Sequence, residues 1–239
     1  SNIGNAYKVL PALHNLPEAE RWYQLSLELC AEQDHLGRAE SLCQLGSVAY
    51  KRFKEARDAG QPEHKVLGHL NEAVRLSDEA LELLPPNAID SLAVAHNQLG
   101  NIFAAAGKLD DALRHYREAI RYGEMEGNLY GAALTQVNVA VTLSEAGRLA
   151  DAKEYALAAL RNYQTYGDRA ADKVQKTLQL IALIEQLSKS KGTALDWWSR
   201  AIRLARRWWP SSHPAATGRR RPGRSVPRRS SGASPGSEP

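Results

Sequence analysis

Leu99–Ala119, LGNIFAAAGKLDDALRHYREA, decides the fold. The stretch predicts a helix, a tight turn at Gly107-Lys108 and a second helix. Its apolar residues are spaced so that they lie on the facing sides of two antiparallel helices. These landmark residues are Leu99, Gly100, Phe103, Ala112, Tyr116 and Ala119. Gly100 and Ala112 are small where the helices must approach closely, so the stretch predicts a helical hairpin.

The same pattern occurs elsewhere along the chain. Forty residues later it returns as Val139, Ala140, Leu143, Ala152, Ala156 and Ala159, with the turn kept as Gly147-Arg148. Upstream, residues 2–7 match residues 98–103 position for position. Between these two copies another set comprises Leu45, Gly46, Ala49, Ala73, Ser77 and Ala80. A pattern repeated at such spacing predicts an array of stacked hairpins.

These landmarks resemble the tetratricopeptide repeat. The forty-residue spacing is similar to that in kinesin light chains, in cortical polarity adaptors and in the carboxy-terminal arrays of bacterial NB-ARC-type signalling ATPases. The resemblance covers roughly residues 1–188 and is most specific from Leu92 to Gly167. It implies an all-α fold, a right-handed solenoid of antiparallel helical hairpins with about four to five repeats.

The expected organisation is an array followed by a tail. The predicted segments are repeats at about 1–36, 37–90, 91–130 and 131–170, a capping helix at 171–188, an amphipathic Trp/Arg-rich helix or degenerate fifth repeat at 189–209, and a basic tail at 210–239. The tail is rich in Pro, Ser, Gly and Arg and has little apolar surface to bury, so we expect it to be disordered.

The first two repeats depart from the pattern. Only two residues precede Ile3, which favours either a piece of a longer array or a frayed first hairpin, and Pro11 should bend or end the first helix early. In the second repeat we expect a helix through residue 59, a break at Gly60-Gln61-Pro62 and a lengthened return helix from 63 to 84. That longer hairpin is either a tolerated extension or a projection that contacts a neighbour.

The net charge of +4 hides an uneven distribution. From Lys189 onward there are twelve Lys and Arg residues against Asp196 and Glu238, a net charge of +10, so residues 1–188 carry −6. Any argument for nucleic-acid binding therefore rests on the tail alone. The basic run at 218–229 has no aromatic residue that could stack on bases.

The sequence shows no catalytic or metal-binding set, and we expect neither an enzyme nor a cofactor. Gly100 to Lys108 lacks the spacing and the Ser or Thr of a phosphate loop. His96 and His115 fall on different helices without a Cys or carboxylate in ligand spacing, which favours structural roles. Cys30 and Cys43 are isolated thiols, and no apolar run approaches the roughly 20 residues of a membrane span. We therefore expect a cytoplasmic protein.

The resemblance also implies a binding surface, because in such arrays the first helix of each hairpin lines a concave groove that binds peptides. Residues that follow the Leu-Gly pair or its substitute should face this groove, as should those one turn earlier and their neighbours. The expected peptide-binding residues are Asn5, Cys43, Gln44, Ser47, Asn97, Gln98, Asn101, Asn138 and Val141. An amide can donate to and accept from a peptide backbone at the same time. Val141 interrupts the polar pattern.

Three functions remain open from the sequence. The first is a noncatalytic module that binds a peptide or protein segment in the groove, as a sensor array cut from a larger signalling protein. The second is a self-assembling scaffold, a homo-oligomer stacked through an open repeat edge. The third is binding of nucleic acid or an acidic partner by the basic tail, with a steep dependence on salt.

Overall fold

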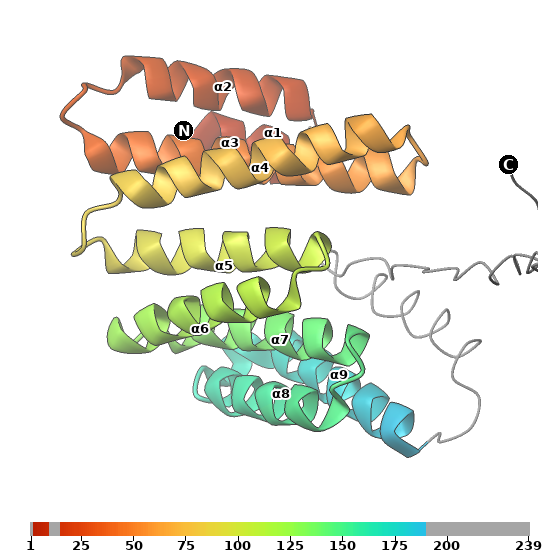
Figure 1. Cartoon of the computed structure of the whole chain (residues 1–239). Coiled ribbons are helices and arrows are strands. Elements are labelled where there is room, and N and C mark those ends of the chain that lie inside the picture. Colours follow the sequence, from red (N-terminus) through yellow and green to blue (C-terminus); the bar gives the residue numbers. More distant parts are fainter. Residues whose placement is uncertain (1, 10–14, 190–239) are drawn as a thin grey trace, which may run out of the picture.

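The computed structural model describes residues 2–9 and 15–189, and these residues form helices joined by short loops, with no strand among them (Figure 1). In chain order the elements are α1 (Asn2–Val9), α2 (Leu16–Leu29), α3 (His35–Asp58), α4 (Glu63–Leu83), α5 (Ile89–Ala105), α6 (Leu109–Met125), α7 (Leu129–Glu145), α8 (Leu149–Gln164), the 3-10 helix η2 (Gly167–Ala170) and α9 (Ala171–Lys189). The predicted all-α solenoid of helical hairpins is confirmed.

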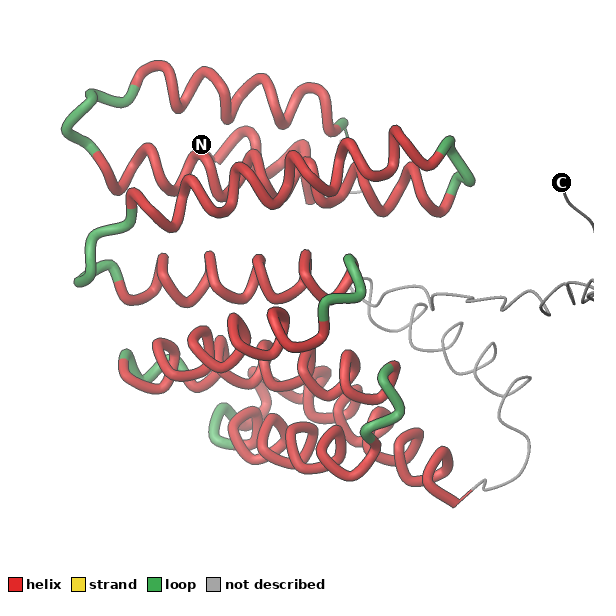
Figure 2. The backbone as a smooth tube through the Cα atoms, viewed as in Figure 1, coloured by secondary structure: helices red, strands yellow, loops and turns green. Residues whose placement is uncertain are grey.

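The helices stack in the order of the sequence. Figure 1 shows α1 and α2 at one end of the array and α8 and α9 at the other, and Figure 2 shows the short loops that alternate between the two sides. Each helix packs mainly on its neighbours in the chain, and α5 also contacts α3 and α7. The first helices of consecutive hairpins therefore lie side by side along one face of the array.

A glycine turn closes the hairpin of α5 and α6. Gly107 has a φ of +75°, in the left-handed region that glycine adopts without a steric penalty. The Lys108 amide donates to the Phe103 carbonyl at 2.9 Å, and the Gly107 amide donates to the Ala104 carbonyl at 3.0 Å. These bonds satisfy carbonyls at the end of α5 and reverse the chain into α6.

The packing inside this hairpin depends on a glycine facing a tyrosine. A Cβ atom placed on Gly100 would lie 2.4 Å from Cδ1 of Tyr116, far inside van der Waals contact. Tyr116 is fully buried, and its hydroxyl donates to Oδ1 of Asn101 at 3.0 Å. The Gly-Asn pair of the first helix thus makes room for the aromatic ring and provides a partner for its hydroxyl.

The other repeats fill the same positions in three ways. In the first repeat, a Cβ on Gly4 would lie 2.7 Å from the Tyr23 ring, and the Tyr23 hydroxyl donates to Asn5 at 2.7 Å. In the fourth repeat the two equivalent positions hold Ala140 and Ala156, both fully buried. Glycine on the first helix therefore faces a tyrosine in two repeats. In the second repeat it faces Ser77, whose hydroxyl oxygen would lie 2.7 Å from a Cβ on Gly46, and two alanines take these positions in α7 and α8.

The second hairpin is the long one. α3 has 24 residues and α4 has 21, and the loop between them contains Gly60-Gln61-Pro62. The additional turns of α3 bury Phe53, whose ring centroid is 6.0 Å from that of Tyr50, and both belong to the same core cluster as the rest of the hairpin. The extension therefore packs within its own hairpin, and its contact with a neighbour stays a prediction.

Three sequence features lie partly or wholly outside the described residues. α1 ends at Val9, and residues 10–14, which include Pro11, are not described. The predicted helix at 194–207 and the basic tail also lie beyond Lys189. The register of a fifth repeat after α9 therefore stays a prediction.

The Gly107 turn predicts opposite effects for two exposed glycines. Gly107→Ala should lower the free energy of unfolding by about 1 kcal/mol, because an L side chain is strained at positive φ. Gly68→Ala should raise it by about 0.5–1 kcal/mol, because Gly68 lies inside α4 with open space around it. Thermal and urea unfolding of both variants measures the difference. Equal shifts for the two variants would contradict this account of the turn.

Candidate functional site

A pocket of about 440 Å³ opens between the first three hairpins. Its walls come from the ends or faces of α1, α2, α3 and α5, and from Leu84 after α4. The lining residues are Asn5, Ser26, Cys30, Gly37, Glu40, Ser41, Cys43, Gln44, Leu84, Asp90, Ser91 and Val94. Three of these, Asn5, Cys43 and Gln44, belong to the groove residues predicted from the sequence.

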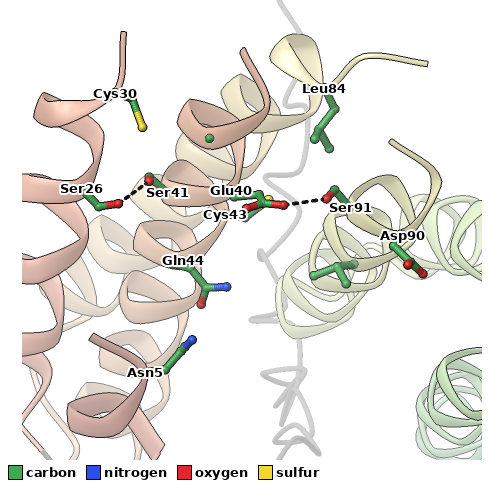
Figure 3. A pocket seen from close by; sticks show the side chains of 12 residues that line it. Asn5, Ser26, Cys30, Glu40, Ser41, Cys43, Gln44, Leu84, Asp90 and Ser91 are labelled. Atoms are coloured by element: carbon green, nitrogen blue, oxygen red, sulfur yellow. Dashed lines mark hydrogen bonds between the residues drawn. The ribbon is translucent and has the colours of Figure 1, made fainter. Parts of the chain in front are cut away.

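Hydrogen bonds hold the polar walls of this pocket. The Ser91 hydroxyl of α5 donates to Oε1 of Glu40 on α3 at 3.1 Å, and Ser41 of α3 is 3.2 Å from Ser26 of α2 (Figure 3). These contacts join residues that are 51 and 15 positions apart in the chain. The pocket is thus formed by neighbouring hairpins together and not by any single one.

Asn5 and Gln44 project into the pocket from α1 and α3 (Figure 3). Asn5 Oδ1 accepts a hydrogen bond from the Tyr23 hydroxyl, and Gln44 Oε1 accepts one from the amino group of Lys8. Because the amide oxygens are engaged on the inner side, the amide nitrogens are the groups presented to the opening. The pocket therefore offers hydrogen-bond donors for a carbonyl-bearing ligand.

The amides at one repeat position connect each hairpin to the preceding one. Gln44 bonds to Lys8 of the first hairpin. Gln98 donates to the Cys43 carbonyl at 3.0 Å and to the Ser77 hydroxyl at 2.9 Å in the second hairpin. These bonds tie the stacked repeats together.

Asn138 occupies the equivalent position in α7. Its Nδ2 donates to Oδ1 of Asn97 on α5 at 3.0 Å. Three successive junctions between hairpins therefore contain a bond from this position. Sequence periodicity placed these amides in one row, but it did not indicate that the row bonds to the preceding hairpin.

The remaining predicted groove residues differ in accessibility. Ser47 is half-buried, whereas Cys43 is only 5% exposed and Val141 only 6% exposed. Asn101 is half-buried and accepts the Tyr116 hydroxyl. Of the predicted residues that line the pocket, Asn5 is exposed and Gln44 is half-buried, so these two are the ones that a ligand can reach.

Lys8 is a buried cation at the margin of the pocket. It is 9% exposed, and its amino group lies 5.4 Å from the centroid of the Tyr23 ring. Burial, with a smaller effect from nearby Lys51, lowers the pKa of Lys8 to about 8. The Lys51 amino group donates to the Lys8 carbonyl, so this contact connects α3 to the end of α1.

A pair of histidines between α5 and α6 was missed by the sequence analysis. Nδ1 of His96 and Nδ1 of His115 are 3.1 Å apart, and the rings of Tyr122 and Phe103 stack on the two imidazoles at centroid distances of 5.7 and 5.2 Å. One nitrogen must donate and the other accept, so at least one ring is neutral. Their separation of 19 residues gave no local signal.

Residues 2–9 and 15–189 contain neither a metal site nor a helix that could span a membrane. No group of three or more His, Cys, Asp or Glu side chains in this part is arranged to hold a metal ion. Cys30 and Cys43 are both free thiols. None of the described helices combines the length and the apolar character needed to cross a bilayer.

The comparisons with known proteins agree with this architecture. Residues 91–165 match the tetratricopeptide repeat family model. No curated protein matches the chain in sequence. Among solved structures, the chain is similar to the crystal structure of BtubC (BKLC) from P. vanneervenii, with a TM-score of 0.61 and 16% sequence identity over 95% of this chain and 85% of that chain. At this identity the likeness shows the fold alone.

The histidine pair predicts a loss of stability in acid. Burial lowers the pKa of His96, and burial together with His96 lowers the pKa of His115 to about 4. Arg114 and Arg121 also disfavour a charged pair, against the opposing charges of Asp111 and Glu118. Between pH 6.5 and 4 the unfolded chain binds protons that the folded chain does not. The free energy of unfolding should therefore decrease as the pH is lowered through this range, by about 1–3 kcal/mol.

Urea unfolding at pH 7 and pH 5 measures this loss. His115→Gln should reduce the difference between the two pH values, whereas His64→Gln at an exposed position should leave it unchanged. If both variants keep the full pH dependence, the histidine pair is not its source.

Proposed function

We propose that this chain of tetratricopeptide repeats is a noncatalytic interaction module that binds an extended peptide or protein segment along the face formed by α1, α3 and α5. The pocket between the first three hairpins is the observation that carries this proposal. Repeats of the matched family generally mediate contacts between proteins. The volume of about 440 Å³ lies within the roughly 300–1,000 Å³ typical of ligand pockets.

The chemistry of the pocket suits a peptide. Asn5 and Gln44 present amide nitrogens that can donate to backbone carbonyls of a bound segment. Val94, 54% exposed, and Leu84 add apolar surface for a side chain. A mixed wall of donors, carboxylates and apolar groups matches a segment that carries both backbone and side-chain contacts.

Peptide binding by all of the predicted groove residues is a more detailed version of this proposal. Gln98 and Asn138 already donate their amide nitrogens within the array, so substitutions there would weaken the fold together with any binding. We therefore assign the primary contacts to the pocket end of the row. The similarity to kinesin light chains and NB-ARC-type arrays, a sensor role, a cytoplasmic location and nucleic-acid binding by the tail stay predictions.

Val94 provides a clean test of groove binding. Val94→Arg places a long cationic side chain at the pocket mouth, from an exposed position that contributes little to the core. A random peptide library selected on the full chain should yield peptides whose affinity falls at least about tenfold, or about 1.4 kcal/mol, on Val94→Arg.

The matched control is Met125→Arg. Met125 is 59% exposed on α6 and does not line the pocket, so this variant should bind the selected peptides like the unmodified chain. Selected peptides that bind equally well to Val94→Arg, or no enrichment at all, would contradict groove binding.

A second candidate function is self-assembly, favoured by an apolar strip on α2. Leu25 and Leu29 lie one helical turn apart and are 41% and 77% exposed. If this strip is an interface, light scattering with size exclusion should show an oligomer of the full chain that Leu25→Glu with Leu29→Glu converts to monomer. Leu178→Glu, at a 43% exposed leucine of α9, should not. A native monomer at all concentrations would exclude this candidate.

A further inference from the structure

The pocket has a one-sided charge. Of its twelve lining residues only Glu40 and Asp90 are charged, and both are exposed carboxylates. Glu40 stands on α3 and Asp90 at the start of α5, and the Ser91 hydroxyl next to Asp90 donates to Glu40. The buried Lys8 amino group at the margin is engaged by Gln44. The mouth of the pocket therefore favours a cationic group.

The chain itself contains a segment of the opposite charge. Residues 210–239 hold six arginines and a single carboxylate side chain, Glu238, whereas residues 1–188 carry a net charge of −6. All six arginines fall within GRRRPGRSVPRR, residues 218–229, which we call the arginine segment. Its guanidinium groups are planar donors that bind carboxylates in a bidentate manner.

The arginine segment is long enough and far enough along the chain to reach the pocket. Arg219 lies 30 positions after Lys189 in the chain. Even with residues 194–207 in the helix predicted from the sequence, the rest can span about 50 Å. Between α9 and the pocket the chain stacks α7, α5 and α3. At an axis-to-axis distance of roughly 8–10 Å between successive helices of this row, α9 and α3 are about 30 Å apart.

We propose that the arginine segment of this chain occupies the pocket between the first three hairpins, with an arginine bound by Glu40 and Asp90. The inference rests on the proposed function, since it assigns an occupant to the same groove. The arginine stem lies along Val94 and Leu84, as aliphatic stems of arginine do on apolar surface. The amide nitrogens of Asn5 and Gln44 donate to backbone carbonyls of the segment.

This contact makes the groove self-occupied. Because the segment is tethered, its effective concentration is on the order of 1 mM, so even a weak contact fills the pocket for much of the time. A peptide from another protein must then displace it. The contact is mainly electrostatic and partly exposed, so salt weakens it.

The reactivity of the Cys30 thiol measures whether the pocket is occupied. Cys30 lines the pocket and is half-exposed, whereas Cys43 is 5% exposed and burial raises the pKa of its thiol to about 12. Alkylation of the full chain by N-ethylmaleimide at low salt therefore proceeds mainly at Cys30. Peptide mapping by mass spectrometry gives the rate at each thiol.

The arginine segment should slow this alkylation. At an effective concentration of about 1 mM and a Kd of about 0.5 mM, Cys30 reacts about threefold more slowly than in a full chain with the six arginines changed to glutamine. Cys30 should react equally fast in the full chain with Glu40→Gln and Asp90→Asn, and in the unmodified chain at about 1 M salt, because both changes weaken the binding of the segment. Glu124→Gln with Glu126→Gln, at exposed carboxylates outside the pocket, should keep the protection.

The outcomes separate this inference from groove binding itself. Equal Cys30 rates at low salt with and without the arginines, in chains of equal helical content, would overturn it. Protection that increases with protein concentration would also overturn it, because the occupant would then be a second copy. If selected peptides bind in a Val94-dependent way while the alkylation rate of Cys30 does not depend on the arginines, peptide binding in the groove is supported. Only its occupation by the arginine segment is then refuted.

Discussion

The close contact between Gly100 and the ring of Tyr116 is the constraint on which the hairpin packing depends. A side chain on Gly100 would overlap that ring, and Asn101 accepts the hydroxyl that burial would otherwise strand. The same arrangement recurs between α1 and α2. Where the ring is absent, small residues take both positions: Gly46 and Ser77 in α3 and α4, and two alanines in α7 and α8. The repeats therefore conserve the space between two helices rather than particular residues.

Hydrogen bonds between successive hairpins turn these units into one array. Gln44, Gln98 and Asn138 occupy equivalent positions, and each bonds to the hairpin before it. Such bonds fix the offset between neighbouring first helices, and that offset brings Glu40 near Ser91 and creates the pocket. The surface available to a ligand is thus a product of the stacking, and the groups that hold the stack are only partly available to bind.

The sequence was sufficient to predict the all-α fold and most helix positions, because a repeated apolar spacing restricts which faces can be buried. The groove was predicted only as a row of positions. Which amide bonds inside the array depends on the offset between hairpins, for which Gln98 and Ser77, 21 residues apart, give no local signal. The His96–His115 pair is another contact across two helices that spacing could not indicate. Peptide binding by the predicted row stays a prediction.

The most direct test of the packing constraint is a double-mutant cycle at Gly100 and Tyr116, followed by urea unfolding of the full chain. With Tyr116 present, Gly100→Ala should lower the free energy of unfolding by about 1–3 kcal/mol, because the new methyl group overlaps the ring. In a Tyr116→Ala background the same change completes the alanine pair found in α7 and α8, so it should be neutral or stabilising. An equal loss in both backgrounds would contradict the dependence of the array on this contact.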